Sequence, residues 1–477
     1  MHKNSALCVC FERVYIFRMR NKMSEISSSE NKMGSMPVFK LIINMSLPLM
    51  FSMLVQALYN IVDSIFVAQL GEDALTAVSL AFPIQNLMIS FAVGTGIGVN
   101  ALLSLRLGQR NQEDVNKAAM NGVFLSIMTY IAFLIMGMTC VPVYLNSQTS
   151  STVIIAYGEE YLHIVIYLGF GFFSGIMFDR LLQATGRTFL SMISQIVGAV
   201  FNIVFDPLLI FGIGIFPKMG IRGAALATVL GQIFALFVSI GLNLKLNHDI
   251  TFKFKNIIPS GKIIAQIYKV GIPAIALSSI TSVVTYFLNL ILGRFSMTAI
   301  AVYGVYFKLN SFIFMPVFGL SNGIVPIIAY NYGARHHRRI TNTIRGALII
   351  ASVIMLFGVF LFEAFPAFFM HLFNASDEMT EIGVHCLRRI APSFIGAAIA
   401  ITLSSVFQAF GDAIYSMIVS FSRQLLIFLP AAYLLSLTGN INNVWWCFII
   451  AEAMSVGMSV FFMRRVYIKK IKDIPFE

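Results

Sequence analysis

The chain has 477 residues, of which 58% are hydrophobic and 11% charged. Soluble domains carry about 25% charged residues, so this composition excludes an ordinary soluble domain and indicates an integral membrane protein. Lysine and arginine number 33 against 21 acidic residues, a net charge of +12. The basic residues gather in alternate loops, which fits the positive-inside rule and argues against nucleic-acid binding.

The first predicted element is a polar leader over 1–37. It lacks the apolar core and cleavage site of a signal peptide, and we expect it to be disordered and assign it no function. Cys8 and Cys10 lie in it, and Cys140, Cys386 and Cys447 lie singly in apolar stretches. None of the five shows a metal-binding or redox spacing, so we expect free thiols.

Twelve apolar stretches follow, each long enough to span a bilayer, which takes about 20 residues in a helix. They are centred near residues 55, 88, 130, 170, 200, 232, 281, 314, 355, 395, 426 and 454. Lipid cannot satisfy exposed backbone N–H and C=O groups, and apolar runs of this length are not barrel strands. We therefore predict an all-α membrane protein with twelve transmembrane helices.

The second half of the chain repeats the first at an offset of 225 residues, which places Pro48 over Pro273. The same offset pairs glycines and arginines: Gly94 with Gly319, Gly98 with Gly323, Gly108 with Gly333, and Arg110 with Arg335. Six helices per copy is an even number, so both copies have the same orientation and form a parallel repeat. We predict two six-helix lobes around a central cavity.

The predicted boundaries follow from this repeat. The first lobe covers 38–244, a polar cytoplasmic linker 245–268, the second lobe 269–466 and a basic cytoplasmic tail 467–477. Basic residues concentrate in the loops on the side of both termini, for example at Arg106, Arg110 and Arg335. Both termini are therefore expected in the cytoplasm.

Polar residues inside the first lobe have no counterpart in the second. Asp63, Asn202 and Asp206 fall on Leu288, Ile427 and Ala431 at the repeat offset. A charge in hydrocarbon costs about 2.5 to 3.5 kcal/mol on insertion scales, so such groups are usually paired, protonated or functional. Asp63, Asp206 and Thr228 are each roughly 9 to 12 Å from the outer end of their helices.

These residues also share faces. Gln56, Asn60 and Asp63 form one stripe, and Asn202 with Asp206 forms another. Two carboxyls with amide and hydroxyl oxygens at one depth suit a shared proton or a Na⁺ ion. The alternative is a set of polar groups satisfied within the bundle. No other metal site is expected.

Three other sets of charged or titratable residues are interpreted separately. Arg423 lies partway into its helix from one membrane face and Glu452 partway into the next helix from the opposite face, so we expect no direct pairing. Glu452 is a second candidate coupling acid. Asp179, Arg180 and Arg187 are expected as boundary charges at the cytoplasmic end of the fourth helix. His336 and His337 are expected on the solvated surface.

Three segments resemble the multidrug and toxic compound extrusion (MATE) family: Tyr59–Asp63, Asn202–Pro207 and Gly223–Thr228. The resemblance covers about 40 to 465, is closest to the DinF-type branch, and in length and loops to MepA-like pumps. It implies that Asp63, Asn202, Asp206 and Thr228 bind the coupling cation. Tyr59 would belong to the surrounding network, with Gln56 and Asn60 beside it. The second-lobe carboxylates of NorM-type members find no counterpart in 271–295 or 383–407.

The resemblance implies multidrug efflux across the bacterial inner membrane by H⁺- or Na⁺-coupled antiport. Pro48 interrupts the helix that carries Asp63, so we expect it to act as a hinge. The expected substrates are amphipathic, often cationic, compounds, which the 44 Phe and 25 Met can accommodate. No cofactor beyond the coupling ion, no enzymatic activity and a monomer in the lipid bilayer are expected.

Two other transporter classes remain as alternatives. A lipid-linked precursor flippase or polysaccharide exporter of the wider superfamily would need basic residues deep in the cavity, for which Arg423 is a candidate. A symporter of the major facilitator type is disfavoured because the loop over 106–111 lacks the Gly-x-x-x-Asp-Arg pattern.

Overall fold

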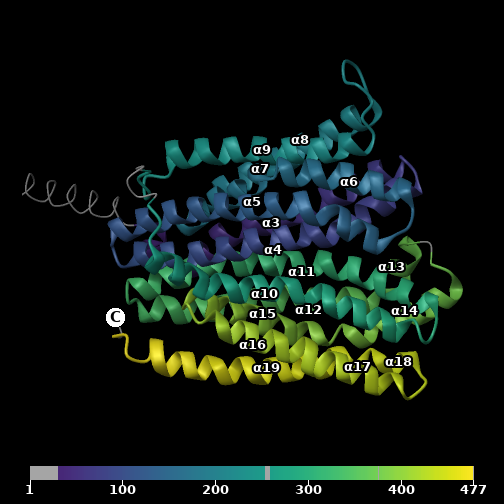
Figure 1. The fold of residues 1–477 in the computed structure, drawn as a ribbon. Helices are drawn as coiled ribbons and strands as arrows, with labels where there is room; N and C mark the ends of the chain where they lie inside the picture. The colour runs from purple at the N-terminus through teal and green to yellow at the C-terminus, as the bar shows by residue number, and fades with distance from the viewer. Residues whose placement is uncertain (1–30, 253–257, 374, 476–477) are drawn as a thin grey trace, which may run out of the picture.

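The computed structural model describes residues 31–252, 258–373 and 375–475. Its long helices run along one common direction and form two lobes that lie side by side (Figure 1). The N-lobe consists of α3 (Val38–Ala68), α4 (Glu72–Gly108), α5 (Gln112–Gln148), α6 (Thr152–Tyr167), α7 (Phe170–Ala184), α8 (Thr188–Phe211) and α9 (Ile221–Leu246).

The C-lobe has the same order of long elements, with more breaks. It consists of α10 (Gly261–Leu292), α11 (Met297–Gly333), α12 (His337–Ala364), α13 (Pro366–Leu372), α14 (Asp377–Ile390), α15 (Ser393–Ala409), α16 (Ala413–Phe421), η2 (Ser422–Phe428), α17 (Leu429–Ser436), α18 (Ile441–Val444), α19 (Trp446–Val466) and η3 (Tyr467–Ile471). A short helix, α2 (Lys32–Ser35), precedes both lobes.

The described residues contain 10 helices long and apolar enough to cross a membrane, or up to 12 when each bent pair counts as one span. The bent pairs are α6 with α7, at 46°, and α14 with α15, at 51°. Pro392 lies in the second break and has no backbone N–H to continue the helix. The prediction of an all-α protein with twelve spanning segments is confirmed.

The lobes meet along a seam formed by α3 and α4 on one side and α10 and α11 on the other. Glycines allow this close approach. A Cβ on Gly319 would lie 2.5 Å from the Met50 Cα, and one on Gly94 would lie 2.9 Å from the Ile275 backbone nitrogen. Similar clashes would occur at Gly98, Gly323, Gly108 and Gly333. The glycines that repeat along the sequence thus build the seam from both sides.

The seam is tight at only one end. The C-terminal halves of α4 and α11 are buried almost throughout, whereas their N-terminal halves expose large side chains such as Phe82 and Phe312. The tight end also carries Arg110 and Arg335, the two non-glycine residues with positive φ among the described residues, at 56° and 61°. We call it the closed end.

The first described residues bridge both lobes at the closed end. The Asn31 side-chain amide donates to the Thr185 carbonyl of the N-lobe at 2.9 Å. In the C-lobe, Asn331 donates to the Met33 carbonyl at 3.0 Å and Arg339 to the Met36 carbonyl at 2.7 Å. The prediction of a disordered leader is therefore wrong for 31–36, and residues 1–30 lie outside the described residues. We call 31–36 the strap.

Other predicted boundaries shift for physical reasons. Helix α10 begins at Gly261, inside the predicted linker, of which 253–257 lies outside the described residues. The last helix continues as η3 to Ile471, where Lys470 pairs with Asp412 at 2.8 Å. His337, predicted on the solvated surface, is buried beside the Tyr467 ring, because the extended helix covers it.

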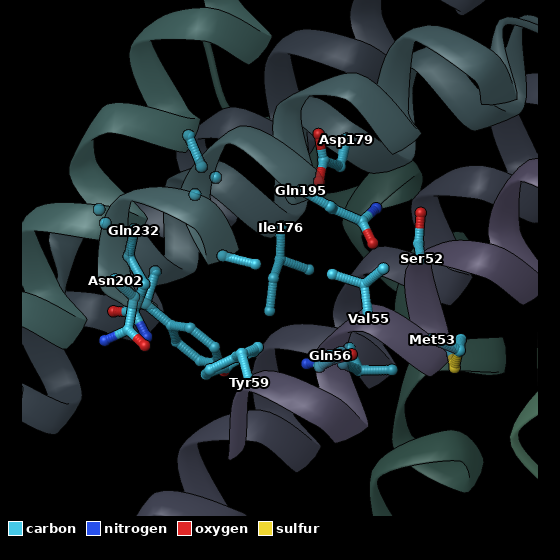
Figure 2. Close-up of a pocket in the computed structure, with 18 of the residues that line it drawn as sticks. Ser52, Met53, Val55, Gln56, Tyr59, Ile176, Asp179, Gln195, Asn202 and Gln232 are labelled. Atoms are coloured by element: carbon cyan, nitrogen blue, oxygen red, sulfur yellow. The ribbon is translucent and has the colours of Figure 1, made fainter. Parts of the chain in front are cut away.

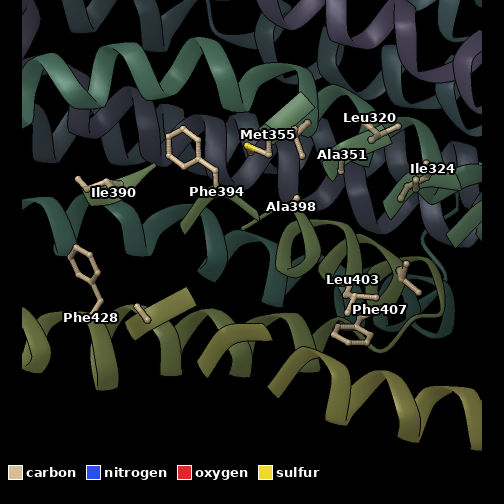
Figure 3. Close-up of a cluster of buried hydrophobic side chains, with 14 of the residues drawn as sticks. Leu320, Ile324, Ala351, Met355, Ile390, Phe394, Ala398, Leu403, Phe407 and Phe428 are labelled. Carbon is tan, nitrogen blue, oxygen red and sulfur yellow. The ribbon is translucent and has the colours of Figure 1, made fainter. Parts of the chain in front are cut away.

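The two lobes differ inside. The C-lobe is filled by one large apolar cluster to which α11, α12, α15 and η2 contribute, including Phe394, Phe407 and Phe428 (Figure 3). Most buried apolar residues of the N-lobe form two smaller clusters, while Leu41, Ile42 and Met45 of α3 join the large cluster. Cys140, Cys386 and Cys447 are free, as predicted.

We predict that Gly323→Ala destabilises the protein, because its Cβ would meet the backbone of Ser46. Overpacking of this kind costs about 1 to 3 kcal/mol, so the thermal unfolding midpoint in detergent should fall. Gly241→Ala is the matched control, since no atom lies within 4 Å of the added Cβ. An equal midpoint for the two variants would contradict the close packing of the seam.

Candidate functional site

The four residues predicted to bind a cation meet where α3, α8 and α9 pack together. The Asn202 amide lies at the centre and donates to Asp206 Oδ1 and to Thr228 Oγ1, both at 3.3 Å. The carboxyl group of Asp63 on α3 interacts directly with that of Asp206 on α8. The sequence offered these residues as separate stripes, and the fold brings them into one group.

The group is rich in acceptors and poor in donors. Asp63 Oδ1, Asp206 Oδ2 and Asn202 Oδ1 are buried without a hydrogen-bond partner among the described residues. An unsatisfied buried acceptor is costly, and two adjacent carboxylates cannot both stay charged without a counter-ion. The arrangement therefore suits a proton shared by the carboxyls, or a small cation such as Na⁺ held by carboxylate, amide and hydroxyl oxygens.

The residues around this group are only partly those expected. Tyr59 lies close to both carboxyls and hydrogen-bonds to Gln56, whereas the side chain of Asn60 is exposed. Sequence reasoning missed Tyr161 of α6, which is buried near Asp63 and accepts a hydrogen bond from Gln85 at 3.2 Å. Its one signal in the sequence is a hydroxyl within an apolar stretch, and many tyrosines share that signal.

A cavity of about 250 Å³ opens beside this group inside the N-lobe. It lies among α3, α4, α7, α8 and α9, and Asn322 of α11 reaches it from the C-lobe. Asn202 and Gln232 lie at one end, Asp179 and Gln195 at the other, and Ile176 lies between them (Figure 2). The cavity therefore connects the cation group with a second polar cluster.

That second cluster corrects the prediction of boundary charges at Asp179 and Arg180. Asp179 Oδ1 accepts hydrogen bonds from Ser194 at 2.5 Å and Ser239 at 2.9 Å. Arg180 is 6% exposed. Helices α6 and α7 meet at a bend, so counting residues along one straight helix places α7 too near the membrane boundary. Asp179 and Arg180 lie inside the lobe instead.

The Arg180 guanidinium is held by amide oxygens. It donates to Gln183 Oε1 at 2.9 Å and, across the seam, to Asn322 Oδ1 at 3.1 Å. Arg187, by contrast, forms a partly exposed pair with Asp249 at 3.1 Å, as a boundary charge should.

The prediction that Arg423 and Glu452 do not pair is wrong. Their side chains form an ion pair between η2 and α19. Arg423 lies 13 residues before the end of α17 at Ser436, and Glu452 lies 11 residues after the start of α18 at Ile441. Arg423 is near the middle of its span when counted from one membrane face, and Glu452 is near the middle of the next span when counted from the other. The two side chains therefore lie at the same depth. The π-helical geometry of η2 also changes the facing of Arg423 relative to an α-helix.

Comparison with known proteins shows the family to which the chain belongs. A family model described as MatE matches residues 48–208 and 273–434, one match in each lobe. The chain belongs to the MatE family. The two matches begin at Pro48 and Pro273, which are equivalent positions of the repeat. MATE proteins are multi-pass membrane transporters, so the expected family and the absence of enzymatic activity agree with this match.

Similar proteins cover nearly the whole chain. The multidrug export protein MepA of Staphylococcus aureus is 28% identical over 445 residues, covering 90% of this chain and 94% of MepA. MepA of Staphylococcus haemolyticus is 27% identical over 435 residues, covering 89% and 93%. A solved outward-facing multidrug resistance MATE transporter has a TM-score of 0.86 at 24% identity, covering 92% of this chain and 98% of that structure. The MATE fold is thereby confirmed.

We predict that the Arg423–Glu452 pair behaves as a coupled unit in stability measurements. Arg423→Met and Glu452→Met should each lower the unfolding midpoint, because each leaves an uncompensated buried charge. The double variant should recover part of the loss, since no charge then remains. A double-mutant cycle in detergent measures this coupling. Strictly additive losses would show that the two side chains do not interact.

Proposed function

We propose that this chain is a cation-coupled multidrug exporter of the bacterial inner membrane, driven by inward flow of H⁺ or Na⁺. The observation that carries the proposal is the buried pair of Asp63 and Asp206 beside the N-lobe cavity. The MepA relatives are named as multidrug export proteins, which supports export of drugs. The substrates we propose are amphipathic, often cationic, compounds. Asp63, Asn202, Asp206 and Thr228 would hold the coupling ion.

The orientation follows from charge. The closed end carries Arg106, Arg110 and Arg335, and the described C-terminal residues lie there as well (Figure 1). By the positive-inside rule this end faces the cytoplasm and the looser end faces outward. Substrate would leave from this arrangement while the ion enters.

The proposed cycle depends on competition between the coupling cation and the substrate for the N-lobe. A cation bound at Asp63 and Asp206 neutralises the pair and draws α3, α8 and α9 together, which changes the N-lobe cavity. An ion shifts a conformational equilibrium only through different affinities for the two states. Pro48 is suited to transmit this change, because it lies between Ser46 and Met50, which pack on Gly323 and Gly319 of the C-lobe. It lacks the N–H that would stiffen α3 there.

The alternative of a lipid-linked precursor flippase or polysaccharide exporter gains no support. Such a transporter needs free basic groups for an anionic headgroup. Arg423 is paired with Glu452, and Arg180 is held by Gln183 and Asn322.

We predict that Asp63→Asn and Asp206→Asn each abolish gradient-driven efflux of ethidium from cells, measured at matched membrane abundance. Each change removes the charge that the coupling ion neutralises. Imposing ΔpH and ΔNa⁺ separately on the wild type identifies the ion. Glu113→Gln is the control, an exposed acid of α5 outside the cation group, and should retain efflux. Intact efflux in the double variant Asp63→Asn, Asp206→Asn would refute the mechanism.

A further inference from the structure

The N-lobe cavity contains an acid that the coupling mechanism does not use. Of the described residues that line the cavity, Asp179 is the only acid. Asp63 and Asp206 do not line it, and their group reaches the cavity through Tyr59, Asn202 and Thr228. Asp179 lies at the opposite end, beside Gln195 (Figure 2).

The carboxyl of Asp179 is held mainly by neutral groups. Ser194 and Ser239 both donate to Oδ1, so this oxygen is fixed by side chains from α8 and α9. Arg180 also lines the cavity and its charge acts on Asp179, but the two side chains form no ion pair. The Arg180 guanidinium points toward α11, where Asn322 holds it.

A buried carboxylate facing a cavity requires a cation or a proton. Neutral oxygens at the same end add acceptors. Ser52 lines the cavity there, and its hydroxyl already donates to the Pro48 carbonyl at 3.0 Å, which leaves its lone pairs for a donor. Gln195 donates one amide hydrogen to Ser191 at 2.9 Å and also hydrogen-bonds to the Asp179 carboxyl, which leaves its carbonyl oxygen as an acceptor. Several acceptors around one charge suit a ligand with N–H donors.

Beyond this end the lining turns apolar. Ile176 lies between Asp179 and the cation group, and Val55 lies beside Gln195 (Figure 2). Phe172, Ala199 and Ala235 also line the cavity. A volume of about 250 Å³ admits a small molecule with one ring system and a short chain. The cavity thus has a charged end and an apolar body.

We propose that Asp179 anchors the ammonium group of a small primary or secondary amine, whose apolar part lies along Val55 and Ile176. The inference rests on the proposed function and assigns a substrate class to its cavity. The repeat supports a specific role, because Ser404 occupies the equivalent position of the C-lobe, so the fold itself does not need a carboxylate here. A cation at Asp179 and one at the Asp63–Asp206 pair occupy two ends of one cavity and repel each other.

Binding to the purified full-length protein tests the proposal without any gradient. Calorimetry in detergent and Na⁺-free buffer compares phenethylamine, which is protonated at neutral pH, with phenethyl alcohol, a neutral molecule of similar shape. The wild type should bind the amine about tenfold more tightly, the contribution of one hydrogen bond to a charged group. Asp179→Asn should remove this preference while still accepting the two serine hydrogen bonds, so folding is preserved. Glu452→Gln should keep the preference.

Three results would overturn the anchor: no preference in the wild type, an unchanged preference in Asp179→Asn, or a preference lost in Asp63→Asn but not in Asp179→Asn. The last would place the amine at the coupling acids. The proposed function can fail separately. If the wild type shows the Asp179-dependent preference but no gradient-driven efflux of any tested cation, Asp179 still binds the amine and the export proposal is refuted.

Discussion

A charge inside a membrane protein must meet an opposite charge, and the two lobes satisfy this demand in different ways. The C-lobe supplies its own partner, since Arg423 and Glu452 neutralise each other between η2 and α19. In the N-lobe, Asp63 and Asp206 have no ion-pair partner among the described residues, and buried oxygens of their group lack a hydrogen-bond donor. Asp179 is held by two serines and feels the charge of Arg180 without an ion pair. The cation group of the N-lobe thus needs a proton or a cation from outside, whereas the charged pair of the C-lobe does not.

The internal repeat separates what the fold requires from what the chemistry requires. Both copies retain the seam glycines, the turns at Gly186 and Gly411 with φ of 85° and 74°, and the positive φ of Arg110 and Arg335. These positions fix the backbone and the contact between lobes. The acids of one copy are replaced by Leu288, Ala431 and Ser404 in the other. The two copies of the backbone therefore carry a large apolar cluster in one lobe and a cavity with polar ends in the other.

The sequence was sufficient for the parts of this structure that depend on local patterns. Apolar length predicted the spans, and the spacing of Asn202 and Asp206 predicted a shared face that the structure shows. The sequence was insufficient where the depth of a residue in the membrane depended on a bend between helices. Asp179 and Arg180 were assigned to the boundary because the α6–α7 break is invisible in hydropathy. Tyr161 was missed because its closeness to Asp63 arises between two helices far apart in the chain.

The strap over 31–36 has a consequence for the balance between conformations. Its hydrogen bonds reach Thr185 in one lobe and Asn331 and Arg339 in the other, so they exist together only while the lobes touch at the closed end. Each such bond contributes about 1 kcal/mol. Parting of the lobes with the strap left on the C-lobe breaks only the bond to Thr185, which alters the ratio of the two states by roughly fivefold. A few residues ahead of the first transmembrane helix thus add their own weight to the state in which the closed end is shut.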